Sequence, residues 1–210
     1  MIEPLLLFWV LFLPGIAPSG EVPPILDFNP VAELTRILVY DGPAFALTLL
    51  LLWRNRRPDE IGFSRPRARD GAIAGITLMA LMALAAVLSL SSSFLGMEED
   101  IPMVGAPRGL PAWLLMVLGG IATGYVEETF FRAYLFLRLG EAGIGRKQMV
   151  LVSVTLFALC HLYEGPWGII NAAGAGIIFS LAYFKGNSVH GVAWAHGAYN
   201  ILVYAMGAKA

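Results

Sequence analysis

The sequence has few charged residues, one cysteine and three histidines. Charged side chains make up 14% of its 210 residues, whereas an average soluble domain has about 25%. Hydrophobic residues reach 58%, and the formal net charge is −1. This composition excludes a disordered chain, an ordinary cytosolic enzyme and a nucleic-acid binder with a basic surface. The single Cys160 excludes an intramolecular disulfide.

Long apolar stretches predict an all-α fold, a polytopic transmembrane helical bundle. A membrane-spanning helix needs about 20 residues, so we expect about seven membrane helices, within a range of about six to eight. No repeat, low-complexity tract or linker divides the chain, which predicts a single integral membrane domain over residues 1–210 in contact with the lipid bilayer. The apolar stretches cover residues 4–17, 31–53, 71–95, 112–139, 148–163, 167–184 and 188–206.

The first two stretches are less regular than the others. Stretch 4–17 is short for a membrane span. A cleaved signal peptide is one interpretation, but Glu3 stands where a signal peptide carries Lys or Arg, so we favour a retained or half-inserted helix. The second stretch contains Glu33, Arg36, Asp41 and Pro43. We therefore expect an interfacial helix over 31–41, then a break, and an apolar helix over 44–53.

The charges of the connections predict the orientation in the membrane. Residues 54–70 are rich in arginine, and the connection 138–148 holds Arg138, Arg146 and Lys147. The alternate connections, 97–110 and 163–166, are acidic or nearly neutral. The positive-inside rule places the Arg-rich connections in the cytoplasm.

Small residues cluster in two of the apolar stretches. Gly119, Gly120 and Gly124 lie in the fourth, and the sequence AAGAG covers 172–176 in the sixth. Helices in lipid approach closely through faces of small residues. These positions therefore predict close helix packing rather than chemistry.

Three charged residues interrupt the fourth apolar stretch. Each charge inside a membrane helix costs about 2.5–3.5 kcal/mol on insertion scales. Glu128 and Arg132 are four residues apart and share a helix face, so they can form an ion pair. Glu127 lies about 100° around the helix and meets Phe131 at the i+4 position. Glu127 is therefore the acid without a partner on its own helix, and an unpartnered acid can serve as a general base.

Two histidines lie in later apolar stretches. His161 follows Phe157 by one turn, and Asn200 follows His196 by one turn on the same face. Taken singly, a buried acid can be a counter-ion or proton relay, and a buried histidine can form an interhelical hydrogen bond. A free glutamate, two histidines and an asparagine on three helices together favour a catalytic site.

These residues resemble the CPBP family, the CAAX-protease and bacteriocin-processing membrane proteins also called Abi proteins. The family motif EExxxR matches Glu127, Glu128 and Arg132. The motif FxxxH matches Phe157 and His161, and HxxxN matches His196 and Asn200. All three motifs occur in order within residues 112–206.

The resemblance implies an all-helical, metal-free intramembrane endopeptidase of the glutamic type. Glu127 and His161 would activate a water molecule, and His196 and Asn200 would hold the oxyanion. Glu128, Arg132 and Phe157 would support them. No cofactor is implied. Zinc remains an alternative, because a glutamate and two histidines can form a catalytic zinc site, although the sequence has no HExxH motif.

We expect the substrate to be a membrane-tethered protein, either lipidated or carrying a C-terminal signal, that is cut near its terminus. No soluble recognition domain and no nucleic-acid partner are predicted. The alternative is a non-proteolytic membrane scaffold or a bacteriocin-immunity protein whose buried charges are structural. Paired halves with broken helices, typical of a transporter, do not occur in the sequence.

Overall fold

The structure is a computed structural model that describes residues 2–16, 25–26, 28–54, 56, 58–96 and 103–207. Every structural statement below concerns these residues. Predictions that fall on residue 17, on Arg57 and on residues 97–102, which include Glu98, Glu99 and Asp100, lie outside them.

The fold is a bundle of helices, with one very short pairing of strands. β1 and β2 pair in parallel over two residues each. In chain order the elements are α1 (Ile2–Ile16), β1 (Ile25–Leu26), α2 (Pro30–Thr35), the π-helix η1 (Arg36–Asp41), α3 (Gly42–Trp53), α4 (Ala68–Leu95), β2 (Met103–Val104), α5 (Leu110–Glu128), the π-helix η2 (Thr129–Tyr134), α6 (Leu135–Glu141), α7 (Arg146–Leu159), the 3₁₀-helix η3 (Leu162–Glu164), α8 (Gly165–Gly186) and α9 (Val189–Gly207).

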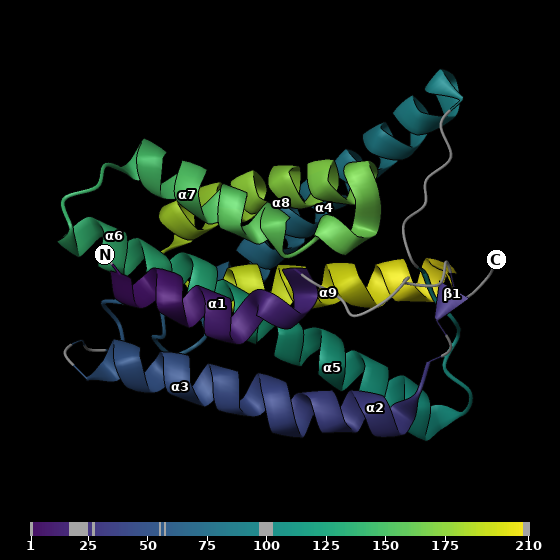
Figure 1. The fold of residues 1–210 in the computed structure, drawn as a ribbon, viewed down its shortest axis with the longest axis horizontal. Helices are drawn as coiled ribbons and strands as arrows, with labels where there is room; N and C mark the ends of the chain where they lie inside the picture. Colours follow the sequence, from purple (N-terminus) through teal and green to yellow (C-terminus); the bar gives the residue numbers. More distant parts are fainter. Residues whose placement is uncertain are drawn as a thin grey trace.

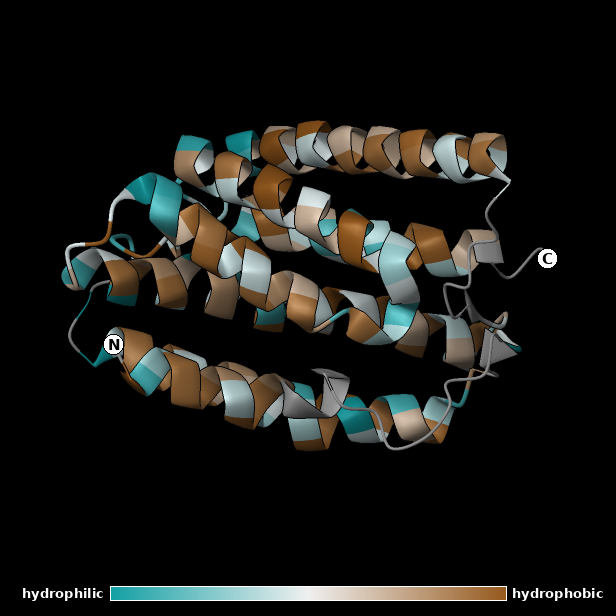
Figure 2. Ribbon diagram, turned by 45° about the horizontal axis from the view of Figure 1, so that its top comes forward, coloured by the Kyte–Doolittle hydropathy of each residue, from teal (hydrophilic) through white to brown (hydrophobic). Residues whose placement is uncertain are grey.

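Consecutive helical segments join into longer rods, and this confirms the predicted all-α bundle. α2, η1 and α3 form one rod, α5, η2 and α6 form another, and η3 continues into α8. Seven rods result in the described part of the chain, and each corresponds to one predicted apolar stretch. Four of them are long and apolar enough to cross a membrane: Pro30–Trp53, Ala68–Leu95, Leu110–Glu141 and Leu162–Gly186. Figure 2 shows hydrophobic residues, coloured brown, along the length of the helices.

The rods run roughly along the long axis of the molecule (Figure 1). α5 and α9 lie in the middle, between the α2–α3 rod on one side and α4, α7 and α8 on the other. The predicted small residues bring α5 and α9 together. A Cβ added at Gly124 would lie 2.5 Å from the carbonyl oxygen of Ala193 and 2.9 Å from the amide nitrogen of Gly197. Only glycine permits this approach of two backbones.

The predicted break in the second apolar stretch is wrong, because residues 30–53 form one rod. No break separates residues 31–41 from 44–53: the π-helix η1 leads directly into α3, and the rod continues through Pro43. The preceding polar residues lie in α2 and in the π-helix η1 of the same rod. They do not require a membrane surface, since Arg36 forms ion pairs with both Glu33 and Asp41.

The Arg-rich connections meet at one end of the bundle. Arg56 pairs with Glu141 at the end of α6, and Arg69 donates a hydrogen bond to the carbonyl of Gly186 at the end of α8. Arg138 lies 3.5 Å from Glu3 near the start of α1. The connections that carry the positive charge therefore share one end, as the predicted orientation requires.

Candidate active site

A completely buried ion pair lies where α5 passes into η2. Glu128 Oε1 accepts a hydrogen bond from Arg132 Nη1 at 3.0 Å, and both side chains have 0% exposure. The same oxygen is 2.9 Å from His196 Nδ1 on α9. The predicted i, i+4 pair is confirmed, and a histidine from another helix joins it. π-Helical turns inside α-helices are frequent at functional sites, and η2 begins directly after Glu128.

Aromatic rings enclose the guanidinium of Arg132. Its central carbon lies 4.8 Å from the ring centroid of Phe157 and 5.1 Å from that of Phe179. Arg132 Nη2 also donates a hydrogen bond to the carbonyl of Gly176 at 3.3 Å. The motif residue Phe157 therefore packs against the motif residue Arg132. Rings over a buried guanidinium replace part of the hydration that the cation loses.

Glu127 projects from α5 in a different direction from Glu128, as the helix geometry predicts. Its side chain is 19% exposed, and Oε2 lies 3.8 Å from His196 Nε2. Among the described residues, no group forms a hydrogen bond with this buried Oε2 atom. His196 thus stands between the two acids, with Nδ1 at Glu128 and Nε2 toward Glu127.

The end of α7 sets the orientation of His161. Its Nδ1 is 2.8 Å from the carbonyl oxygen of Phe157. A carbonyl only accepts hydrogen bonds, so Nδ1 carries the hydrogen and, in the neutral ring, Nε2 keeps a free lone pair. Phe157 therefore supports the site twice, through its ring at Arg132 and through its backbone at His161. His161 is oriented as a base or hydrogen-bond acceptor.

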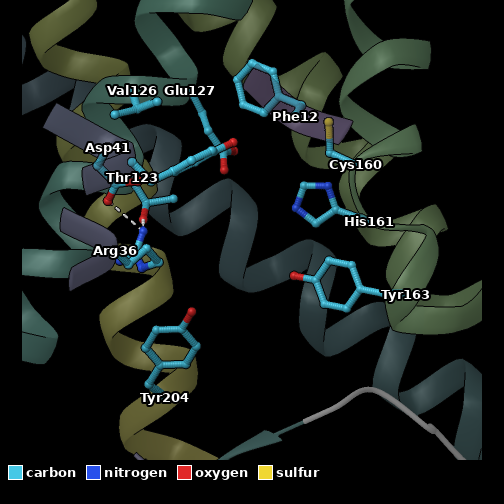
Figure 3. Close-up of a pocket in the computed structure, with 11 residues that line it drawn as sticks. Phe12, Arg36, Asp41, Thr123, Val126, Glu127, Cys160, His161, Tyr163 and Tyr204 are labelled. Atoms are coloured by element: carbon cyan, nitrogen blue, oxygen red, sulfur yellow. Dashed lines mark hydrogen bonds and ion pairs between the residues drawn. The ribbon is translucent and has the colours of Figure 1, made fainter. Parts of the chain in front are cut away.

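Glu127 and His161 face one cavity of about 430 Å³. Figure 3 shows the two side chains extending toward one another from opposite walls, with Arg36, Asp41 and Thr123 grouped on the wall of Glu127. Polar groups line much of this space, so water can enter it. The lining residues are Phe12, Arg36, Tyr40, Asp41, Thr123, Val126, Glu127, Cys160, His161, Tyr163 and Tyr204.

The structure brings most, but not all, of the predicted site residues together. Glu127, Glu128, Arg132, Phe157 and His196 form one connected group, and His161 joins it through Phe157. Asn200 lies on α9 one turn beyond His196 and is partly exposed. Neither Asn200 nor the buried His196 is among the residues that line the cavity.

Sequence reasoning missed a polar group that the second rod forms together with Thr123 of α5. Arg36, Asp41 and Thr123 line the same cavity as Glu127. The sequence carries a signal for the ion pair in this group, because Glu33 and Arg36 have the i, i+3 spacing of a helical ion pair. The tyrosines Tyr40, Tyr163 and Tyr204 were missed as well, and no spacing in the sequence relates them to one another.

No cluster of three or more histidine, cysteine, aspartate or glutamate side chains suited to a metal ion occurs within the described ranges.

Residues 109–202 match the family of type II CAAX prenyl endopeptidase Rce1-like proteins. The match contains all three motifs and confirms the resemblance to CAAX proteases. It supports an intramembrane endopeptidase of the CAAX type in general, and together with the four long apolar helices it indicates a membrane protein. Searches of curated proteins and of solved structures give no significant match.

Proposed function

Since residues 109–202 match the CAAX prenyl endopeptidases, we propose that this chain is a glutamic-type intramembrane endopeptidase with Glu127 as its general base. The observation that carries the proposal is the pair formed by Glu127 and His161 across one cavity. Glu127 has a carboxylate oxygen without a hydrogen bond in the described structure. Peptide hydrolysis needs a base that is free to take a proton from water.

In the proposed reaction, a water molecule binds between Glu127 and His161 Nε2. Glu127 takes one proton from this water, and the resulting hydroxide attacks the peptide carbonyl carbon. The carbonyl oxygen becomes the oxyanion of a tetrahedral intermediate. When the C–N bond breaks, the proton held by Glu127 passes to the leaving nitrogen, which departs as an amine.

His196 and Asn200 are the proposed donors to the oxyanion. His196 Nδ1 faces the Glu128 carboxylate at 2.9 Å, so Nε2, on the side of Glu127, is the ring nitrogen left to donate to an oxyanion. A ring that carries hydrogen on both nitrogens can donate from Nε2, and it lies between the carboxylates of Glu127 and Glu128. Asn200 donates from its amide only if its side chain turns toward the reacting carbonyl. Donors of this kind contribute about 2.7–4 kcal/mol to the stability of the transition state.

We expect a membrane-tethered protein substrate, lipidated or with a C-terminal signal, because the cavity lies among membrane helices. Cleavage of a soluble peptide as fast as its lipid-anchored form would contradict this expectation. The proposed mechanism uses no metal. Activity should therefore survive a strong chelator, whereas loss of activity that zinc restores would favour the zinc alternative.

The direct test compares three variants of the purified protein in detergent. Glu127→Gln and His161→Ala should lower cleavage of a lipid-anchored peptide by at least 100-fold, because each removes a group from the water site. Glu60→Gln is the control, since Glu60 is exposed in the connection before α4. Cleavage by Glu127→Gln at the native rate would favour the scaffold or immunity alternative, in which the buried acids are structural.

A further inference from the structure

A second cavity, of about 350 Å³, lies between α4, α8 and α9 and shares no lining residue with the cavity of Glu127 and His161. None of the described residues that line it carries a charge. A phosphate or carboxylate would therefore lose its hydration there without gaining a counter-ion. Ala86, Ser89 and Met206 line the second cavity and are exposed, so it opens onto the outer surface of the bundle.

The second cavity arises where α4 leaves the other helices. Gly174 of α8 holds the middle of α4 close, because a Cβ added there would lie 2.7 Å from Leu84 Cδ2. The last turns of α4 rise away from α8 and α9 (Figure 1), and Phe94 in these turns is 90% exposed. Since Ala68–Leu95 is long and apolar enough to cross a membrane, the medium at this opening is lipid.

One hydrogen-bond donor of the second cavity has no acceptor in the described part of the chain. Trp167 lines the cavity from the first turn of α8. Its Nε1 atom is shielded from solvent and forms no hydrogen bond with any described residue. An indole N–H can only donate, and buried donors are normally hydrogen-bonded. An acceptor on a ligand would satisfy this donor.

A second donor lies one turn further along α8. Asn171 follows Trp167 by four residues, so the two side chains share a helix face, and both line the second cavity. Asn171 Nδ2 donates to the Tyr199 hydroxyl at 3.1 Å, which uses one of the two hydrogens of the amide. Neutral donors on α8 thus share the cavity with apolar side chains of α4, such as Met82 and Leu88.

We propose that the second cavity binds an acyl chain of a bilayer glycerolipid, and that the ester carbonyl of this chain accepts a hydrogen bond from Trp167 Nε1. The hydrocarbon matches the apolar walls, and the carbonyl supplies an acceptor without adding a charge. Tryptophan near the end of a membrane helix lies at the level of the lipid headgroups, close to the ester groups of a glycerolipid. An isoprenoid chain without a carbonyl would fill the space but leave the indole N–H without an acceptor.

The position of Trp167 also assigns the lipid to one leaflet. The carbonyl of Gly186, at the far end of α8, accepts a hydrogen bond from Arg69 at the Arg-rich end of the bundle. Trp167 precedes Gly186 by 19 residues, which is about 28 Å along a helix axis. The lipid therefore belongs to the leaflet away from the Arg-rich connections. Its chain would join the last turns of α4 to α8 and α9.

The test compares two lipids that differ only in the proposed acceptor. Dioleoyl phosphatidylcholine carries ester carbonyls, and its diether analogue has the same chains and headgroup without them. Native mass spectrometry of the full chain, freed of lipid in detergent, gives the dissociation constant of each. The native chain should bind the ester lipid about two- to tenfold more tightly than the ether lipid, which is the effect of one ordinary hydrogen bond.

Trp167→Phe should reduce the affinity for the ester lipid to that for the ether lipid, because phenylalanine keeps an aromatic ring but has no N–H. Trp9→Phe is the matched control, since Trp9 is exposed on α1 and does not line the second cavity. A second pair of variants tests the cavity itself. Ala86→Trp should weaken binding of both lipids about tenfold, because an indole would fill the opening. Ala83→Trp, at an exposed position of α4 outside the lining, should leave binding unchanged.

Three results would overturn the proposal. The first is equal affinity of the native chain for the ester and ether lipids, or binding of neither. The second is an ester preference that Trp167→Phe leaves intact. The third is equal binding by Ala86→Trp and Ala83→Trp, which would show that the lipid lies elsewhere. None of these measurements depends on endopeptidase activity.

Discussion

At the scale of single residues, the order of the charges along one helix predicted which acid is paired and which is free. Glu128 and Arg132 are four apart, and they form the buried pair. The sequence could not show that His196 lies between Glu127 and Glu128, because this position depends on how α9 packs against α5.

Arg132→Ala should destabilise the protein strongly. Glu128 would remain at 0% exposure without its cation, and removal of one partner from a buried ion pair costs about 3–5 kcal/mol. Thermal unfolding in detergent and abundance in the membrane measure this effect. Arg54→Ala, at an exposed position, is the control. An Arg132→Ala protein with native abundance and unfolding temperature would contradict the structural role of the ion pair.

At the scale of helices, close packing of α5 on α9 brings Glu127 and Glu128 of α5 next to His196 of α9. The small residues predicted this kind of contact but not the partner helix, since small-residue faces do not specify which helix they meet. The rod over 30–53 was predicted less well. Its charges and its proline were taken to predict an interfacial helix followed by a break, whereas Arg36 forms ion pairs with two acids within one continuous rod.

Gly124→Val should separate α5 from α9. The atoms that its Cβ would meet, Ala193 O and Gly197 N, belong to the backbone and cannot rotate away. We expect a loss of about 1–3 kcal/mol in stability, as for other overpacked sites, and a larger loss of cleavage because His196 moves away from Glu127. Gly75→Val is the matched control on α4, where nothing lies within 4 Å of an added Cβ. Equal behaviour of the two variants would show that the close approach is not needed.

At the scale of the whole molecule, the Arg-rich connections share one end of the bundle, and the positive-inside rule assigns that end to the cytoplasm. This orientation is a prediction. It follows from the charge of the connections, since the helices themselves are compatible with either direction across a membrane.

Cysteine labelling in intact cells tests the orientation. Cys160 is the single cysteine of the chain, so Cys160→Ala provides a background without thiols. In that background, Arg65→Cys should react with a membrane-impermeant maleimide only after the membrane is opened, whereas Ala106→Cys should react at once. Both positions are exposed in the structure. The reverse pattern would place the Arg-rich end outside the cell.

The most direct test of the central claim, that Glu127 drives peptide hydrolysis, compares protein termini in host cells. One strain carries the native chain and the other Glu127→Gln, at matched expression and matched abundance in the membrane. The account predicts that uncleaved membrane-tethered precursors accumulate in the mutant strain. Identical termini in the two strains would contradict the claim and favour a structural role for the buried acids.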